Sequence, residues 1–460
     1  MELKGKKVAV LGLGKSGIAA AKLLHQKEAK VFISEINNEL SFKGELYSYL
    51  NNNFEIELGR HSEKILESDM IVISPGINTD IPIIKKAHEL NISVISEIEL
   101  AFKFIKNQTL VSITGTNGKT TVTTLLGEVV KNDKKETIVA GNIGYPLCEA
   151  INELKEEHIL ITEISSFQLE NIEKFKPHIS VLLNITEDHL DRYFDMEEYT
   201  RAKKNITINQ KRGDFIVLNY DDFRIRSLDI RTSAKIIYFS VKEKIKEGVY
   251  IEDNKIISNL KGKKEFICNL EDIKIKGKHN QENILAVVSV SILLNVNKEI
   301  LKDTISNFAG LEHRIKEVKN IHGVTFINDS KATNIDAMLK AMESFNSPII
   351  LIAGGRDKKG NFILLRNLLL KKTKEMILIG ESKEKIRNLL KECVNTHLVD
   401  NLSKAVNLAY ALAEDGDIVL FSPGCSSYDM FSNYEERGEC FKKEVFNLAS
   451  RVGEKVGVSL

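Results

Sequence analysis

Short runs of Val, Ile and Leu alternate along the whole chain with longer segments in which apolar residues recur at helical spacing. Strands that are apolar throughout are buried on both faces, as in parallel sheets covered by helices. The clearest expected strands are Lys7–Leu11, Met70–Ser74, Leu110–Thr114, Val181–Asn184, Ile349–Ala353, Met376–Ile379 and Ile418–Ser422. The pattern predicts an α/β protein made of mainly parallel sheets flanked by helices.

The same alternation divides the chain into three blocks, and 460 residues are too many for one core. The first block, residues 1–98, opens with a strand and a glycine loop, and the second, residues 99–310, opens with another. The second block also holds a Lys-rich stretch, residues 242–264, that predicts exposed hairpins. The third block, residues 311–460, has its own alternation of strands and helices. Three such blocks predict ligands held between domains.

Composition narrows the class of protein. The 65 Lys and Arg residues balance 64 Asp and Glu residues, so the overall charge favours no nucleic-acid partner. The five cysteines are scattered, without a CxxC pair or a zinc-type cluster, which is typical of a reduced compartment. No segment approaches the ~20 apolar residues of a membrane span, and the first residues predict a strand rather than a signal peptide. We therefore expect a cytoplasmic protein that binds neither nucleic acid nor membrane.

The strongest single feature is a glycine loop between an expected strand and an expected helix, Thr114-Gly-Thr-Asn-Gly-Lys-Thr-Thr121. Backbone N–H groups of such loops surround phosphate oxygens, and the helix N-terminus adds positive potential. Lys119 would reach the terminal phosphates, and the Thr120 hydroxyl would bind Mg²⁺. Ile113 stands where the usual pattern has its first glycine, and the alternative is a turn that only caps a helix. The position between strand and helix favours phosphate binding.

A second glycine pattern, Gly12-x-Gly14-x-x-Gly17, follows the strand Lys7–Leu11, and Glu35 ends the next expected strand. This arrangement fits the dinucleotide fingerprint, with an acidic residue about 20 positions further on. Alone it is weak, because a tight turn that packs a helix on a strand has the same glycines. The pattern predicts a phosphate-bearing nucleotide on this helix without indicating which one.

Acidic residues and a histidine stand at the ends of expected strands in the second block. Ligands of open α/β sheets gather at the carboxyl ends of strands, so Glu163, Asp188 and His189 are expected to share a site with Lys119. A carboxylate such as Glu163 suits Mg²⁺. Each acid alone is more simply an exposed loop residue or a helix cap, and only the combination with the glycine loop favours a site. By its pattern alone, Lys203 is a solvated helix lysine.

Three loops of the third block follow strands and are rich in hydroxyl groups and lysines: Asn328–Asn334, Gly354–Lys358 and Ser422–Ser427. Because all three fall at carboxyl ends of strands, we expect them to form one pocket for a small anionic ligand. Cys425, in the third loop, could be a nucleophile. No histidine stands near it in sequence, however, and a small packing residue explains it better.

Taken together, these motifs resemble the Mur ligases over the whole chain. The family signature combines the glycine loop, a Glu before a Ser pair, an Asn-x-x-x-Asp-His segment, a His-Asn-x-x-Asn helix start and a His-Arg pair, and all occur in the family's order. The last two motifs are His279, Asn280 and Asn283, and His313 and Arg314. Other segments resemble the family members that add D-glutamate: Gly141–Gly144, Thr186–Tyr193, Asn328–Asn334 and Ser422–Gly438.

The resemblance implies three domains: a Rossmann-like N-terminal domain for a UDP-linked substrate, a P-loop ATPase-like central domain, and a Rossmann-like C-terminal domain for the amino acid. It implies a ligase of peptidoglycan precursor synthesis that works as a monomer. Its reaction would be the ATP-dependent formation of an amide bond between UDP-N-acetylmuramoyl-L-alanine and D-glutamate. The reaction would pass through an acyl phosphate, with ATP and Mg²⁺ as cofactors.

The resemblance also assigns residues. It implies contacts with the UDP substrate at Ser16, Glu35, Ser74, Gly76 and Asn142. It implies ATP contacts at Gly115, Thr116, Asn117, Gly118, Lys119, Thr120, Thr121, Asn283, Arg314 and Asp329. D-Glutamate would be bound by Lys331, Thr333, Lys358, Ser427 and Tyr434, and close relatives commonly have Phe where Tyr434 stands. Mg²⁺ would be held by Thr120, Glu163 and Lys203, and a second Mg²⁺ by His189. Lys203 would be carbamylated by CO₂, and Lys119, Glu163, His189 and Lys203 would be the catalytic residues.

Three other interpretations stay open. A nicotinamide-dependent oxidoreductase would explain the first glycine pattern but neither the second glycine loop nor the third block. A sibling ligase would add another amino acid, or a glutamate ligase would act on folate, although folylpolyglutamate synthases lack the N-terminal nucleotide unit. A regulatory nucleotide-binding protein without turnover would not need Lys119, Glu163 and His189 together.

Overall fold

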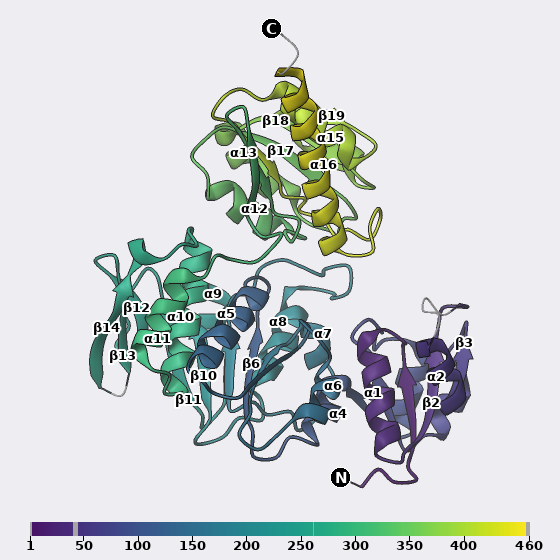
Figure 1. Ribbon diagram of the computed structural model, residues 1–460. Coiled ribbons are helices and arrows are strands. Elements are labelled where there is room, and N and C mark those ends of the chain that lie inside the picture. The colour runs from purple at the N-terminus through teal and green to yellow at the C-terminus, as the bar shows by residue number, and fades with distance from the viewer. Residues whose placement is uncertain (1, 40–44, 261, 457–460) are drawn as a thin grey trace. The chain divides into compact units, whose positions relative to one another are not determined.

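The structure is a computed structural model, and it describes residues 2–39, 45–260 and 262–456. Its strands form three sheets of five, nine and six strands, most of which run parallel to their neighbours (Figure 1). The strands β4 (Met70–Ile73), β9 (Ile179–Leu182) and β17 (Ile349–Gly354) are buried along their whole length. These strands are the continuous apolar runs of the sequence, and the α/β prediction is confirmed.

The first sheet is entirely parallel. In sheet order its strands are β3 (Glu55–Leu58), β2 (Lys30–Glu35), β1 (Lys7–Leu11), β4 and β5 (Ser93–Ser96). The helices of this part are α1 (Lys15–Gln26), α2 (Glu45–Asn53), α3 (Pro82–Glu89) and the 3₁₀ turn η1 (Glu63–Glu67). Because β1 lies between β2 and β4, the strand order reverses there, and ligands of such sheets bind at this point.

The second sheet is parallel over its central part and ends in an antiparallel meander. In sheet order its strands are β14 (Lys263–Asn269), β13 (Lys255–Leu260), β12 (Gly248–Glu252), β11 (Lys235–Ser240), β10 (Phe215–Asn219), β9, β6 (Thr109–Thr114), β8 (Ile159–Glu163) and β7 (Thr137–Gly141). The meander β12–β14 overlaps the Lys-rich stretch, residues 242–264, so the predicted hairpins are present. They are not exposed throughout, because residues 248–250, 256–258 and 267–268 are buried. The strand order reverses at β6, directly before the second glycine loop.

The helices that go with the second sheet vary in length from one turn to more than four. They are α4 (Glu97–Phe102), α5 (Lys119–Asn132), α6 (Leu147–Ala150), α7 (Ser166–Leu169), α8 (Met196–Lys204), α9 (Phe223–Arg226), α10 (Lys278–Leu293) and α11 (Lys298–Asn307), with 3₁₀ turns η2 (Ile151–Glu153), η3 (Asn205–Thr207) and η4 (Leu270–Asp272). Helices α5 and α11 pack against each other, and Asn132 donates a hydrogen bond to the Thr304 hydroxyl at 3.0 Å.

The third sheet has one antiparallel edge strand. In sheet order its strands are β15 (Lys316–Ile321), β16 (Val324–Asn328), β20 (Ile418–Phe421), β17, β18 (Thr373–Ile379) and β19 (Asn395–Leu398). Its helices are α12 (Ile335–Glu343), α13 (Arg366–Lys372), α14 (Lys383–Leu390), α15 (Leu402–Leu412) and α16 (Tyr434–Val456), with the 3₁₀ turn η5 (Phe362–Leu365). Strand β20 pairs with both β16 and β17, so the loops that follow these three strands are neighbours. The long helix α16 packs beside α15 (Figure 1).

By its internal contacts the chain separates into two compact units. The second unit contains the third sheet and two segments from earlier in the chain, Thr186–Met196 and Lys274–Gln281, and the first contains the other two sheets. His189 therefore belongs to the second unit, and Lys119, Glu163 and Lys203 belong to the first. Among the helices of the described ranges, none combines the length and hydropathy that a bilayer span requires.

Candidate functional site

The glycine loop of the second sheet joins β6 to α5, and its backbone is possible only with glycine at two positions. Gly115 and Gly118 have φ angles of 154° and 90°, and a Cβ on Gly118 would stand 2.3 Å from Asn283 Oδ1. Lys119, the first residue of α5, donates hydrogen bonds of 2.8 Å to the carbonyls of Gly115 and Thr116. Ile113 is a buried residue of β6, so the position that lacks the usual first glycine belongs to the strand.

Lys203 lies against this loop and is not a solvated helix lysine. Its side chain is 1% exposed, and its Nζ donates a hydrogen bond of 2.8 Å to the Gly115 carbonyl, which also accepts from Lys119. Tyr199, one helical turn earlier, places its ring 4.6 Å from Lys203 Nζ and its hydroxyl 3.2 Å from Thr116 Oγ1. The interpretation from the local pattern was wrong because residues 199 and 203 share the buried face of α8.

Glu163 ends β8, the strand next to β6, and is 2% exposed. Its Oε1 accepts a hydrogen bond of 2.8 Å from the Asn142 side chain. Its Oε2 is buried without a hydrogen-bond partner in the part of the chain that the structure describes. The hydroxyl of Thr121, in the first turn of α5, is also buried without a hydrogen-bond partner among these residues. Buried oxygens without partners are costly, and a cation bound beside Glu163 would compensate its free oxygen.

The glycine loop of the first sheet has the close packing of the nucleotide fingerprint. A Cβ on Gly17 would stand 1.9 Å from the Gly12 carbonyl oxygen, so this position requires glycine. Ser74, after β4, donates a hydrogen bond of 2.9 Å to the same carbonyl. Glu35 accepts hydrogen bonds from the backbone N–H of Leu13 at 2.7 Å and of Asn37 at 3.0 Å. Its carboxylate thus shapes the loop.

The remaining predicted contacts for the UDP substrate lie at the same edge of the first sheet or beside Glu163. Ser16 is half-buried in the first turn of α1, and Gly76 has open space where a side chain would be. Asn142 is exposed after β7, and its backbone N–H donates to the Glu163 carbonyl at 2.8 Å. The substrate contacts of these residues are predictions.

In the second unit, Arg314 stands in a strained loop before β15. The residues on either side of it, His313 and Ile315, have positive φ angles of 60° and 46°, which is unusual for residues with a Cβ and most of all for a β-branched one. Asp329 accepts from the Ser422 hydroxyl at 2.7 Å and from the Ile315 N–H at 3.2 Å. Burial raises the pKa of Asp329 to about 7, against the effect of Ser422 and the charge of Arg314.

Helix α10 carries the His-Asn-x-x-Asn motif, which begins at His279 and ends at Asn283. Asn283 is 3% exposed and faces Gly118 in the first unit. His279, in the second unit, is buried, and its Nε2 has no hydrogen-bond partner within the described ranges. Burial, together with the charges of Arg314 and Lys340, lowers the pKa of His279 to about 3. A neutral imidazole is therefore held close to Arg314.

Asp188 connects the segment Thr186–Met196 to two loops of the third sheet. Its carboxylate pairs with Lys358 Nζ at 3.2 Å, accepts from the Asn334 side chain at 3.0 Å, and lies 3.6 Å from His189 Nε2. Burial alone would raise the pKa of Asp188, but these neighbours lower it to about 2. That Asp188 shares a site with Lys119 stays a prediction, and within its own unit Asp188 has the partners given above.

The three loops at the carboxyl ends of β16, β17 and β20 contact one another, through hydrogen bonds from the Gly424 N–H to the Ala332 carbonyl at 2.9 Å and from the Arg356 N–H to the Ser426 carbonyl at 3.0 Å. The Lys331 ammonium is 2.6 Å from the Tyr434 hydroxyl and 4.1 Å from the centre of that ring. Ser427 is buried and Thr333 is half-buried. That these side chains bind an anionic ligand remains a prediction.

Cys425, in the loop that follows β20, is a packing residue. It is 1% exposed, and burial raises the pKa of its thiol to about 12, so it holds no thiolate at neutral pH. All five cysteines are free thiols. The nucleophile interpretation is excluded by the burial of this side chain.

Sequence reasoning missed Asn334 as a partner of Asp188, and it missed the buried Arg437 in the first turn of α16. Asn334 fits the signal of a helix cap, and its side chain indeed accepts from the Ala337 N–H. Arg437 has no such signal, because a charged residue between Glu436 and Gly438 has the pattern of a solvated helix face.

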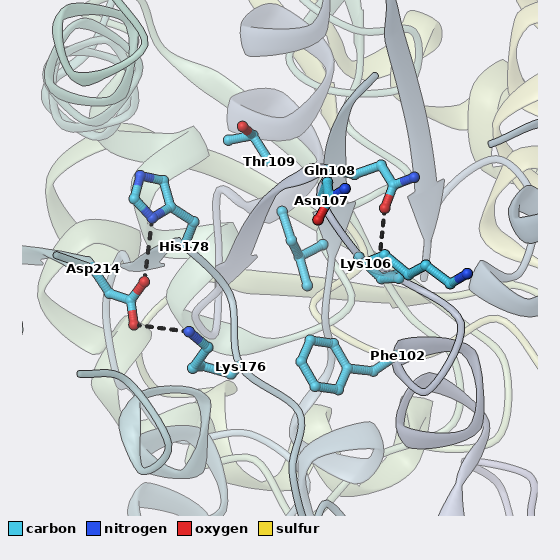
Figure 2. A pocket seen from close by; sticks show the side chains of 10 residues that line it. Phe102, Lys106, Asn107, Gln108, Thr109, Lys176, His178 and Asp214 are labelled. Carbon is cyan, nitrogen blue, oxygen red and sulfur yellow. Dashed lines mark hydrogen bonds and ion pairs between the residues drawn. The ribbon is translucent and has the colours of Figure 1, made fainter. Parts of the chain in front are cut away.

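A cavity of about 300 Å³ lies at the opposite edge of the second sheet, where β6, β9 and β10 begin (Figure 2). In the lining of this cavity, the Asp214 carboxylate lies 3.4 Å from Lys176 Nζ and 3.2 Å from His178 Nδ1 (Figure 2). The Asp214 carboxylate also accepts from the Lys211 N–H at 2.8 Å. These polar groups therefore have hydrogen-bond partners among themselves, and the hydrogen bond to Lys211 stabilises the turn before β10.

Three family models match the chain in order. Residues 6–96 match the MurD-like N-terminal domain of Mur ligases, residues 113–291 the Mur ligase middle domain, and residues 313–425 the glutamate ligase domain of Mur ligases. The second match covers the glycine loop, Glu163 and Lys203, and the third covers Arg314, Asp329 and Lys331.

Curated relatives are similar over nearly the whole chain. The UDP-N-acetylmuramoylalanine--D-glutamate ligase of Clostridioides difficile is 43% identical over 451 residues, which are 97% of this chain and 100% of the relative. The enzyme of the same name from Thermoanaerobacter pseudethanolicus is 44% identical over 453 residues, again 97% of this chain and 100% of the relative.

Solved structures share the fold at lower identity. The MurF ligase from Thermotoga maritima, solved in complex with ADP, has a TM-score of 0.61 at 19% identity and is matched over 97% of both chains. A pseudomurein peptide ligase type C from Methanothermus fervidus has a TM-score of 0.58 at 19% identity, over 95% of this chain and 100% of its own. The order of the motifs, the family models and the full-length relatives agree, and the chain belongs to the Mur ligase family.

Proposed function

We propose that the protein is the ATP-dependent ligase that joins UDP-N-acetylmuramoyl-L-alanine to D-glutamate in peptidoglycan precursor synthesis. The observation that carries this proposal is the 43–44% identity to ligases of that name over 97% of the chain. The site agrees with it, because a phosphate-type loop, two lysines on one carbonyl and a buried carboxylate lie on neighbouring strands and helices of the first unit. We further propose domain boundaries at residues 1–98, 99–310 and 311–460.

The reaction needs an activated carboxyl group, because a carboxylate is a poor electrophile. The L-alanine carboxylate attacks the γ-phosphorus of ATP and forms an acyl phosphate, and ADP leaves. The amine of D-glutamate then attacks the acyl carbon, loses a proton, and phosphate leaves as the amide forms. Catalysis of such a transfer is mainly positioning and charge stabilisation. Backbone N–H groups of residues 115–121 and the Lys119 ammonium would supply the positive side of that stabilisation.

The residues beside the glycine loop fit Mg²⁺. The free Oε2 of Glu163 is a hard anionic ligand that the protein leaves without a hydrogen bond within its described part. Thr120, Glu163 and a carbamylated Lys203 would hold Mg²⁺, which would neutralise charge on the phosphates when bound, and His189 of the second unit would hold a second Mg²⁺. The position of Lys203 suits a metal-binding carbamate, because the side chain is buried against the glycine loop and donates to the same Gly115 carbonyl as Lys119.

The substrates would meet residues of all three sheets. The UDP substrate would bind at the strand reversal of the first sheet, at Ser16, Glu35, Ser74 and Gly76, with Asn142 on the muramoyl part. The adenine nucleotide would contact Asn283, Arg314 and Asp329. D-Glutamate would bind at Lys331, Thr333, Lys358, Ser427 and Tyr434, where the loops after β16, β17 and β20 meet. We also propose a cytoplasmic monomer, and its five free thiols agree with a reduced compartment.

The test is phosphate release from ATP in the presence of UDP-N-acetylmuramoyl-L-alanine, with D-glutamate, L-glutamate, L-lysine and diaminopimelate supplied one at a time. We expect release with D-glutamate only, and none from Lys119→Ala under the same conditions. Release with another amino acid alone would make the chain a sibling ligase. No release with any of the four would refute the proposed substrates, and folate would be tested next.

A further inference from the structure

Arg437, in the first turn of α16, is the largest of the fully buried side chains, with 1% of its surface exposed. Within the described residues its guanidinium forms no ion pair with a carboxylate. Burial lowers the pKa of Arg437 to about 10, so the group stays charged at neutral pH. The charges of Asp429 and Asp329 favour the charged form without forming an ion pair with it, so the hydrogen bonds of the guanidinium must compensate its burial.

The guanidinium joins two of the three loops at the carboxyl edge of the third sheet. Nη2 donates to the Ser330 carbonyl at 2.7 Å, and Nε donates to the Ser330 hydroxyl at 3.0 Å. Nη1 donates to the Cys425 carbonyl at 3.1 Å. Ser330 follows β16 and Cys425 follows β20, so one planar group holds the loops of two neighbouring strands together.

The anchors of Arg437 stand directly beside the residues proposed to bind D-glutamate. Ser330 precedes Lys331, and Cys425 is two residues before Ser427. The Ser330 hydroxyl donates to the carbonyl of Tyr434 at 2.8 Å, and the Tyr434 hydroxyl accepts from Lys331 at 2.6 Å. The Gly424 N–H also donates to the Ala332 carbonyl at 2.9 Å, and the guanidinium of Arg437 adds three further hydrogen bonds between the two sides of the proposed amino-acid pocket.

We propose that Arg437 is a positioning residue for the amino-acid substrate, which holds the Lys331 and Ser427 loops at the separation that D-glutamate requires. This inference rests on the proposed function. A guanidinium is needed because its rigid fork can bind two carbonyls at once, whereas a single ammonium reaches one of them well. The residue acts through the loops and does not itself touch the reacting atoms.

The test measures KM separately for D-glutamate, ATP and the UDP substrate in Arg437→Lys and Arg437→Met. Arg437→Lys keeps the charge and loses the fork, and Arg437→Met loses both at similar length. We expect KM for D-glutamate to rise about tenfold or more, equivalent to ~1.4 kcal/mol, in Arg437→Met and by a smaller factor in Arg437→Lys. The KM values for ATP and the UDP substrate should stay within about twofold. Arg451→Met is the matched control, since Arg451 is exposed on the same helix.

An unchanged KM for D-glutamate in Arg437→Lys would overturn the inference, because the fork would then be unnecessary. An equal rise in all three KM values would overturn it too, since that result marks general destabilisation. If Arg437→Met does not fold, Arg437→Lys decides alone. Lys331→Met separates this inference from the proposed function: if that variant also leaves KM for D-glutamate unchanged, the pocket itself is misassigned. If only the Arg437 variants leave it unchanged, the pocket stands and the role of Arg437 falls.

Discussion

Replacing Glu163 by Met should abolish the ligase reaction and at the same time stabilise the ligand-free protein. Glu163 is 2% exposed, and its Oε2 has no hydrogen-bond partner among the described residues. An unpaired buried polar group costs roughly 1–3 kcal/mol, and more when it is charged. Met has a similar length and no polar oxygen, so this cost disappears in the variant.

The substitution also loses one favourable contact, the hydrogen bond of 2.8 Å from Asn142 to Glu163 Oε1. Asn142 is exposed, and its amide can turn to water, so this loss is about 1 kcal/mol or less. The difference favours Glu163→Met by about 1 kcal/mol. For a domain the size of residues 113–291, that raises the midpoint of thermal unfolding by about 2–4 °C.

The assay is thermal unfolding followed by circular dichroism, in EDTA and again with Mg²⁺ and a non-hydrolysable ATP analogue. In EDTA we expect Glu163→Met to melt above the wild type, and Glu163→Gln to gain less, because its amide still leaves a buried polar atom at the same place. With Mg²⁺ and the analogue the wild type should gain more than the Met variant. A Met variant with an intact fold that melts below the wild type in EDTA would refute the reasoning.

Three further predictions concern Lys203, Tyr434 and Asp329. Lys203→Ala should lower kcat by orders of magnitude, and native mass spectrometry of the wild type in bicarbonate should show the mass of one bound CO₂; an active variant or no added mass would return Lys203 to a packing role. Tyr434→Phe removes the hydrogen bond to Lys331 but keeps the ring 4.1 Å from the ammonium, so KM for D-glutamate should rise by about threefold or less at little change in KM for ATP; steady-state kinetics measures both, and a much larger rise would show that the hydroxyl is needed. The raised pKa of Asp329, about 7, means that the folded protein binds more protons than the unfolded chain between about pH 4 and pH 7. Its contribution to stability should therefore fall as pH rises through that window, and denaturant titrations of wild type and Asp329→Asn should converge below about pH 4 and differ above it.

The sequence predicted the strands and glycine loops well because these features are local. The apolar run Lys7–Leu11 is β1 residue for residue, and the helix expected after the glycine loop is α5, which begins at Lys119. The departure at Ile113 was also visible, but its reason was not, since that residue is held by pairing with β8 and β9. Local patterns thus placed the motifs, and pairing between distant strands decided what each motif could contain.

The side chains that sequence reasoning misplaced or missed are those whose environment comes from distant parts of the chain. Lys203 appeared solvated, yet it is buried by contact with Gly115, which lies 88 residues away. Arg437 had the pattern of an exposed helix residue, and its partner Ser330 lies 107 residues away. Amphipathic spacing indicates which face of a helix is polar, but it cannot show that a polar side chain is itself buried against a loop.

The buried carboxylates at the two edges of the second sheet differ in whether their oxygens have hydrogen-bond partners. This difference distinguishes a structural carboxylate from a candidate ligand. At the amino edge, both oxygens of Asp214 have partners, from His178, Lys176 and a backbone N–H. At the carboxyl edge, Glu163 keeps one oxygen without a partner within the described ranges. Glu97 and Glu99 also have such an oxygen. Burial raises the pKa of the Glu97 carboxyl to about 7, so a proton can bind there, and the Lys103 ammonium lies 3.7 Å from the free oxygen of Glu99. The unpaired oxygen of Glu163, on the strand beside a phosphate-type loop, agrees with the Mg²⁺ site proposed above.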